Sequence, residues 1–175
     1  MDGWVIERVV RAGERRVDVP MDYLRRIARA SRGAFAKFGM FLPLASHRQH
    51  APREVWHLAR LAATQVQDCG TCVQVVVNDA RRDGVPAATL RAALQPDRAA
   101  AEDALTDDEL LALRYGRAVA ERSPEVETVV QSVQTRWGER VLVELALAVA
   151  AVHVFPIVKR GMGMAVACAR VTVDV

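Results

Sequence analysis

The stretch Asp68-Cys69-Gly70-Thr71-Cys72 (residues 68–72) lies between two segments whose apolar residues have helical spacing, 51–66 and 69–82. Gln67-Asp68 supplies the turn between them. Cysteines three positions apart lie on one face of a helical turn, within reach of a disulfide after modest adjustment. At a helix N-terminus, unpaired N–H groups and the macrodipole favour thiolate over thiol. This stretch therefore predicts a helical pair with a redox-active cysteine pair at its junction.

The rest of the chain has the same helical spacing between its proline and glycine breaks, without strict alternation over strand length. We expect Trp4, Val5 and Val9 on the buried side of the first helix, with Val10 as a further candidate. The fold class is predicted to be all-α, with 1–175 as one domain, 1–45 as an N-terminal helical extension and 51–95 as the core around the cysteines. Further helices are expected at residues 3–12, from Pro20, between Gly33 and Pro43, at 86–94, at 106–121, from Ser123-Pro124, and from 138 beyond Pro156.

The composition is that of a soluble globular protein, with 51% hydrophobic and 26% charged residues among 175. The net charge of +3 is mild, the basic residues are spread along the chain, and aromatic residues make up 5%. These features argue against a nucleic-acid partner. The 24 basic residues include only two lysines, Lys37 and Lys159, so the chain is strongly biased towards arginine.

Two segments bear on localisation. The N-terminus has acidic residues and lacks the uninterrupted apolar core of a secretory signal, so a cytoplasmic location is expected. The longest apolar run, Val141–Val158, contains Glu144, His153 and Pro156. These interruptions favour a central buried helix over a membrane span.

Three stretches together resemble the core of the carboxymuconolactone decarboxylase / alkyl hydroperoxidase D-like family. They are Arg53-Glu54-x-x-His57-Leu58-Ala59-Arg60-Leu61, Asp68-Cys69-Gly70-Thr71-Cys72-Val73 and Arg81-Arg82-Asp83-Gly84-Val85-Pro86. In that family a helix carrying a glutamate leads into a CxxC, a histidine follows the second cysteine by four, and a glycine-containing turn starts the next helix. The likeness covers residues 51–95, loosely includes the apolar helix from Val141, and does not extend to 1–45.

The resemblance implies a helical bundle that assembles as a homo-oligomer, a trimer or higher. It implies peroxide reduction or disulfide exchange without a metal or organic cofactor, with Cys72 as the attacking thiol, Cys69 as the resolving thiol and an external dithiol as reductant. Electrostatics alone favour Cys69, the thiol nearer the helix start, so the assignment of Cys72 comes from the resemblance.

Two positions depart from the family pattern. The histidine position is Val76, and the glutamate position, twelve before the first cysteine, is His57. We therefore expect His57 to act as the base, oriented by Glu54, with Arg60 holding the thiolate. The alternative is a solvated surface histidine, because His57 lies nearly opposite the apolar stripe of its helix.

The remaining polar candidates are expected to have structural or solvent-exposed roles. A zinc site would need two more ligands, and Cys168 is isolated in an Ala/Val context. His153 is expected to be a satisfied core histidine and His50 a solvated loop residue. Glu144 is expected to be a carboxylate on an exposed turn, and the alternative is a buried partner for an imidazole.

Three functions remain open at this level. The first is a CxxC thiol oxidoreductase that reduces peroxides. The second is a non-redox member of the same family that acts on a small lactone or acid and whose cysteines only pack. The third is a helical binding protein with a degenerate site, which Val76 favours.

Overall fold

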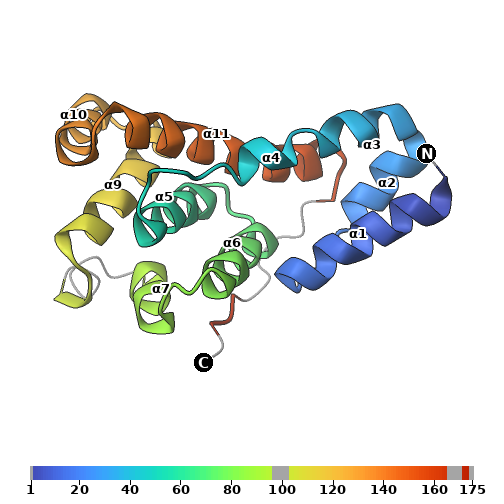
Figure 1. Cartoon of the computed structure of the whole chain (residues 1–175), viewed down its shortest axis with the longest axis horizontal. Helices are drawn as coiled ribbons and strands as arrows, with labels where there is room; N and C mark the ends of the chain where they lie inside the picture. The colour runs from blue at the N-terminus through green and yellow to red at the C-terminus, as the bar shows by residue number, and fades with distance from the viewer. Residues whose placement is uncertain (1, 96–102, 165–170, 174–175) are drawn as a thin grey trace.

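The computed structural model describes residues 2–95, 103–164 and 171–173, and every regular element among them is an α-helix, as predicted. Figure 1 shows their arrangement. The helices are α1 (Gly3–Val17), α2 (Asp22–Ala30), α3 (Arg32–Gly39), α4 (Leu42–Ala45), α5 (Arg53–Val66), α6 (Gly70–Arg82), α7 (Ala87–Leu94), α9 (Asp107–Glu121), α10 (Val126–Trp137) and α11 (Glu139–Gly161).

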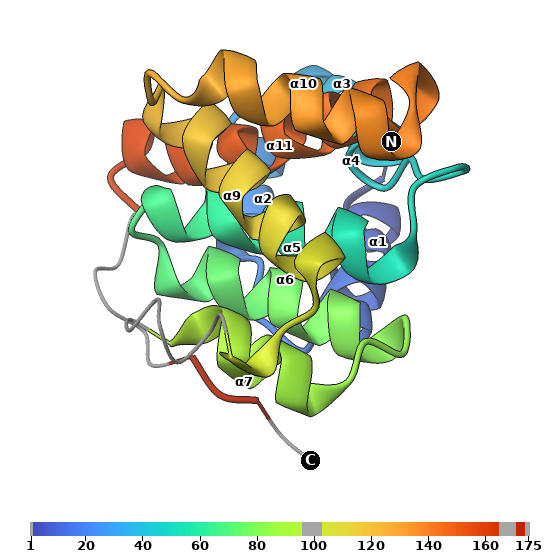
Figure 2. The same ribbon diagram turned by 90° about the vertical axis from the view of Figure 1, so that its left-hand side faces the viewer.

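Helix α5 is the central element of the fold. It packs against α9, α11, α6 and α7, and α10 covers α9 and α11 (Figure 2). Ten consecutive residues of α5, Val55 to Thr64, are buried. Gly116 of α9 permits a close approach of α9 to α5, because a Cβ there would fall on the carbonyl oxygen of Ala59. The main hydrophobic core therefore surrounds α5 on all sides.

Helices α1–α3 gather at the end of the molecule opposite α9 and α10 (Figure 1). Their apolar side chains form a second, smaller core with the C-terminal part of α11, including Ile6, Val10, Tyr23 and Phe155. Helix α1 also contacts α6. The N-terminal segment thus closes the structure over the helices that carry the cysteines and the end of the apolar helix.

Helix α11 contains the apolar run Val141–Val158 and packs against α5, α10 and α4. It is long and apolar enough to cross a membrane by length and composition alone, with a mean hydropathy of 2.4 over its most apolar window. Nine of its residues are buried. The prediction of a helix central to the core is confirmed.

The prediction for the first helix was wrong in its length and in placing Trp4 and Val9 on the buried face, but it was right for Val10. The helix extends to Val17, and Trp4 is 66% and Val9 50% exposed, while Ile6, Val10 and Val17 are buried. The buried residues of the longer helix form a different stripe, because α2 and α6 cover the side of α1 that carries Ile6 and Val10. The second helix begins at Asp22 rather than Pro20.

Glu144 is buried, which corrects the expectation of an exposed carboxylate. It accepts backbone hydrogen bonds from Gln49, His50 and Ala51 at 2.9–3.1 Å, and its Oε1 lies 2.7 Å from Nδ1 of His50. Burial raises the pKa of Glu144, but the bonds from Ala51 and His50 outweigh it and lower the pKa to about 2. The carboxylate therefore ties the loop before α5 to α11.

Candidate functional site

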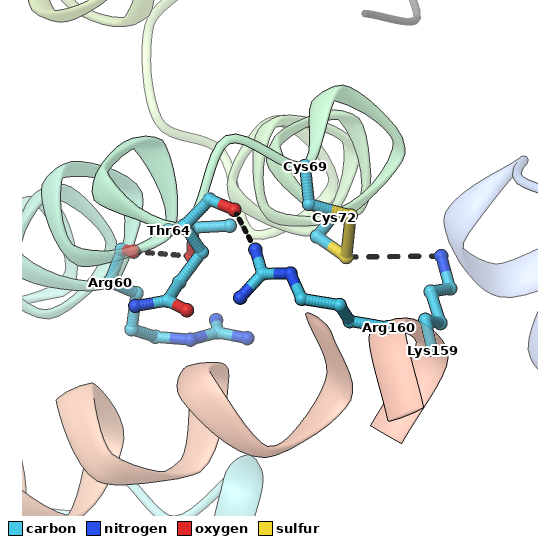
Figure 3. Close-up of a disulfide and its surroundings, with 7 residues drawn as sticks. Arg60, Thr64, Cys69, Cys72, Lys159 and Arg160 are labelled. Carbon is cyan, nitrogen blue, oxygen red and sulfur yellow. Dashed lines mark hydrogen bonds between the residues drawn. A yellow bond between two sulfur atoms is a disulfide. The ribbon is translucent and has the colours of Figure 1, made fainter. Parts of the chain in front are cut away.

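Cys69 and Cys72 lie at the start of α6, where the sequence predicted them. Cys69 is the N-cap residue, Cys72 is in the first turn, and their Cα atoms are 5.2 Å apart. The two sulfurs form a disulfide (Figure 3). Asp68 makes the turn into α6 with a left-handed backbone, φ 48°. Cys168 lies outside the described residues.

A cavity of about 500 Å³ lies where the two cores meet, walled by α1–α4 on one side and by α5, α6 and α11 on the other. Most of its lining is apolar, including Leu24, Phe35 and Phe38. Cys72 and Val76 line it, one helical turn apart, whereas Cys69 does not. Of the two cysteines, only Cys72 faces this space.

Lys159, near the end of α11, places a charged group beside the disulfide. Its ammonium lies 3.8 Å from Sγ of Cys72 and 5.3 Å from the ring centre of Tyr23, and it also lines the cavity (Figure 3). The residue is only 9% exposed, and burial lowers its pKa. No carboxylate of the described residues lies within ion-pair distance of Lys159.

Sequence reasoning did not assign Lys159 to the site. The available signal was its rarity, since it is one of two lysines in an arginine-rich chain, at the end of the longest apolar run. The next residue, Arg160, donates a 2.8 Å hydrogen bond to the carbonyl of Gln67 and so ties the end of α11 to the turn before the cysteines.

His57 is buried, so the alternative of a solvated surface histidine was wrong: α5 is covered on both faces. Its Nε2 lies 3.1 Å from Oδ2 of Asp83, and its Nδ1 lies 3.4 Å from Nη1 of Arg60. Burial, then the charge of Arg60, lowers the pKa of His57 to about 4, against the opposing bond to Asp83. No hydrogen bond joins His57 to either cysteine among the described contacts.

Arg60 and Glu54 also have partners other than the cysteines. Arg60 forms a 2.9 Å ion pair with Asp79 and stacks over the ring of Trp56 at 4.1 Å. It lines the Cys72 cavity together with Asp79, while His57 lines a separate cavity of about 190 Å³. Glu54 forms a 2.8 Å ion pair with Arg53. The expected base and its orienting carboxylate are thus placed apart from the cysteine pair.

The site has the parts for dithiol chemistry: one sulfur facing a cavity, a second sulfur bonded to it, and an ammonium beside the first. Among the residues that the structure describes, no group of three or more His, Cys, Asp or Glu side chains is arranged to hold a metal ion. No protein-family model, curated protein or solved structure matches this chain.

Proposed function

We propose that the chain is a CxxC thiol oxidoreductase that reduces a peroxide through a cycle between the Cys69/Cys72 dithiol and its disulfide. Cys72 is the attacking thiol and Cys69 the resolving thiol. An external dithiol is the reductant, and a reducing cytoplasm is the setting.

One observation carries this proposal: the sulfur of Cys72 faces a cavity, lies 3.8 Å from a buried ammonium and is bonded to the sulfur of Cys69. A cation beside a thiol lowers the thiol pKa, and so does a position in the first turn of a helix. Both effects act on Cys72. The assignment of Cys72 by family resemblance thereby gains a physical basis in this chain.

The reaction balances as a two-electron reduction. The Cys72 thiolate attacks one peroxide oxygen, the O–O bond breaks, and the leaving oxygen takes a proton to become an alcohol or water. The resulting sulfenic acid is attacked by the sulfur of Cys69, which expels water and forms the disulfide. The external dithiol then returns two electrons and two protons by thiol–disulfide exchange and becomes a disulfide itself.

In this proposal Lys159 takes the charged role that the family pattern gives to a histidine at position 76. Valine at 76 neither holds a charge nor moves a proton, whereas the Lys159 ammonium, which comes from α11, stabilises the thiolate. In this proposal the chain resembles the carboxymuconolactone decarboxylase / alkyl hydroperoxidase D-like family in its cysteine pair and its helical fold. It differs from the family in lacking the histidine of the family's proton relay.

Self-association is part of the same proposal. Several large apolar side chains are exposed, including Met40 at 72%, Val143 at 48% and Ile157 at 56%. Burial of such side chains against a second copy of the chain would stabilise an oligomer. Light scattering after size exclusion tests this point, and a monomer at micromolar concentration would contradict it.

The function is tested by peroxide consumption with a dithiol as reductant. Wild-type protein should consume peroxide, lose two titratable thiols per chain and regain them on reduction. Cys72→Ser should abolish turnover, and Cys69→Ser should allow one sulfenic acid to form without a second turnover. Cys168→Ser is the matched control and should retain activity. Full turnover by Cys72→Ser would refute the assignment.

A further inference from the structure

In the disulfide form the ammonium of Lys159 has no ion-pair partner among the described residues. The sulfur at 3.8 Å from this ammonium is neutral, and the Tyr23 ring centre lies 5.3 Å from it. The other cations lining the cavity, Arg16 and Arg60, both pair with Asp79. Lys159 is only 9% exposed, and a buried ammonium without a described carboxylate partner is costly in an apolar wall.

We propose that the cavity of the disulfide form binds an apolar monocarboxylate, with its carboxylate on Lys159 and its chain among the apolar side chains of α1–α3. The cavity volume of about 500 Å³ falls within the range of small-molecule sites. Val9, Leu24, Phe35 and Phe38 supply apolar walls, and Lys159 supplies one polar anchor. Arg16, Arg60 and Asp79 also line the cavity, but they pair with one another, so Lys159 is the charged lining residue without a described ion-pair partner. One unpaired cation in a mostly apolar lining fits an anionic amphiphile better than a polar metabolite.

Binding of the carboxylate should depend on the redox state of the cysteine pair. This dependence rests on the proposed dithiol cycle. Reduction creates a thiolate at Cys72, which takes the Lys159 ammonium as its own ion-pair partner. The carboxylate then loses its anchor and also faces a like charge. By linkage, a ligand that prefers the disulfide form makes the disulfide harder to reduce.

Calorimetric titration of the full chain with decanoate tests the site. The disulfide form should bind decanoate at least about tenfold more tightly than 1-decanol, because a charge-assisted contact is lost with the alcohol. This comparison needs no variant. Lys159→Met should lower decanoate affinity by a similar factor, whereas Lys37→Met, at an exposed lysine, should not change it. Equal binding of decanoate and 1-decanol, or full affinity in Lys159→Met, would overturn the site.

The dependence of binding on redox state is tested by repeating the decanoate titration with dithiothreitol present. Wild-type affinity should fall about tenfold on reduction. The double variant Cys69→Ser, Cys72→Ser has no thiolate and should bind decanoate equally with and without dithiothreitol. Equal wild-type affinity in both redox states, with peroxide reduction intact, would overturn the coupling alone. Decanoate binding to the disulfide form without any peroxide reduction would instead refute the proposed function and leave the site standing.

Discussion

The imidazole of His57 and the carboxylate of Asp83 lie 3.1 Å apart and join the middle of α5 to the C-terminal end of α6. A carboxylate accepts a hydrogen bond, so Nε2 carries the proton and Nδ1 is the acceptor that lies 3.4 Å from Nη1 of Arg60. Both ring nitrogens are thus engaged by the helix pair. This arrangement favours a structural role for His57 over a role as proton acceptor for Cys72.

His57 should make the free energy of unfolding depend on pH. Its folded pKa of about 4 lies below the unfolded value of 6.5, so unfolding takes up a proton between these values. Stability should therefore fall as the pH falls from 6.5 towards 4, by up to about 1.4 kcal/mol per pH unit from this group. His57→Gln keeps a donor for Asp83 without titrating, and it should flatten that part of the profile in urea denaturation.

The same variant separates a structural role from a catalytic one. We expect His57→Gln to leave the pH dependence of Cys72 alkylation unchanged, measured with Cys168→Ser as background. A shift of the alkylation midpoint to higher pH in His57→Gln would instead support His57 as the base.

The cysteine pair and its helix could be predicted from the sequence because both depend on local spacing. The contacts around the cysteine pair could not be predicted in this way, because they join residues that are far apart in the sequence. Lys159 follows Cys72 by 87 positions, and Glu144 binds a loop more than 90 residues before it. Helical spacing of α5 indicates only one apolar stripe, and the burial of His57 on the other face results from helices that cover that side.

Lys159 should lower the pKa of the Cys72 thiol in the reduced protein. An opposite charge at about 4 Å shifts an ionisable group by about one to three pH units. Lys159→Met removes the charge and keeps the apolar stem, so the midpoint of Cys72 alkylation should rise by about this amount. Lys37→Met is the control. An unchanged midpoint in Lys159→Met would show that the helix start alone activates the thiol.

Glu144 should contribute strongly to stability through the loop before α5. Glu144→Gln replaces an oxygen acceptor by an amide group that faces backbone donors, and should reduce the free energy of unfolding by about 2–3 kcal/mol. Glu139→Gln, at an exposed position on the same helix, should change it by less than about 0.5 kcal/mol. Similar effects of the two changes in urea denaturation would contradict the role of the buried carboxylate.

The contact between α5 and α9 should not tolerate a side chain at Gly116. Gly116→Ala places a methyl group on the Ala59 carbonyl, and the helices must separate, so we expect a loss of at least about 2 kcal/mol. Gly161→Ala is the matched control in a helix, with no atom within 4 Å of the added carbon. It should leave the thermal midpoint unchanged or raise it slightly. Equal midpoints for the two variants would show that α9 packs less closely than described.

Val76 offers a way to restore the charge that Lys159 supplies. Val76 lies one helical turn after Cys72 and lines the same cavity, so an imidazole there would face the sulfur. In the Lys159→Met background, Val76→His should therefore lower the Cys72 alkylation midpoint again, by about one pH unit, because an imidazolium stabilises the thiolate.

Val76→Leu in the same background is the control, because it adds volume without an ionisable group. Its alkylation midpoint should equal that of Lys159→Met alone. The imidazole must be protonated to act, so the effect of Val76→His should weaken as the pH rises above the pKa of the introduced histidine. Circular dichroism establishes that each variant is folded before alkylation is compared. If the histidine and leucine variants have the same alkylation midpoint, a side chain at position 76 of α6 does not lie close enough to the Cys72 sulfur to stabilise its thiolate. A histidine there then cannot replace Lys159 of α11.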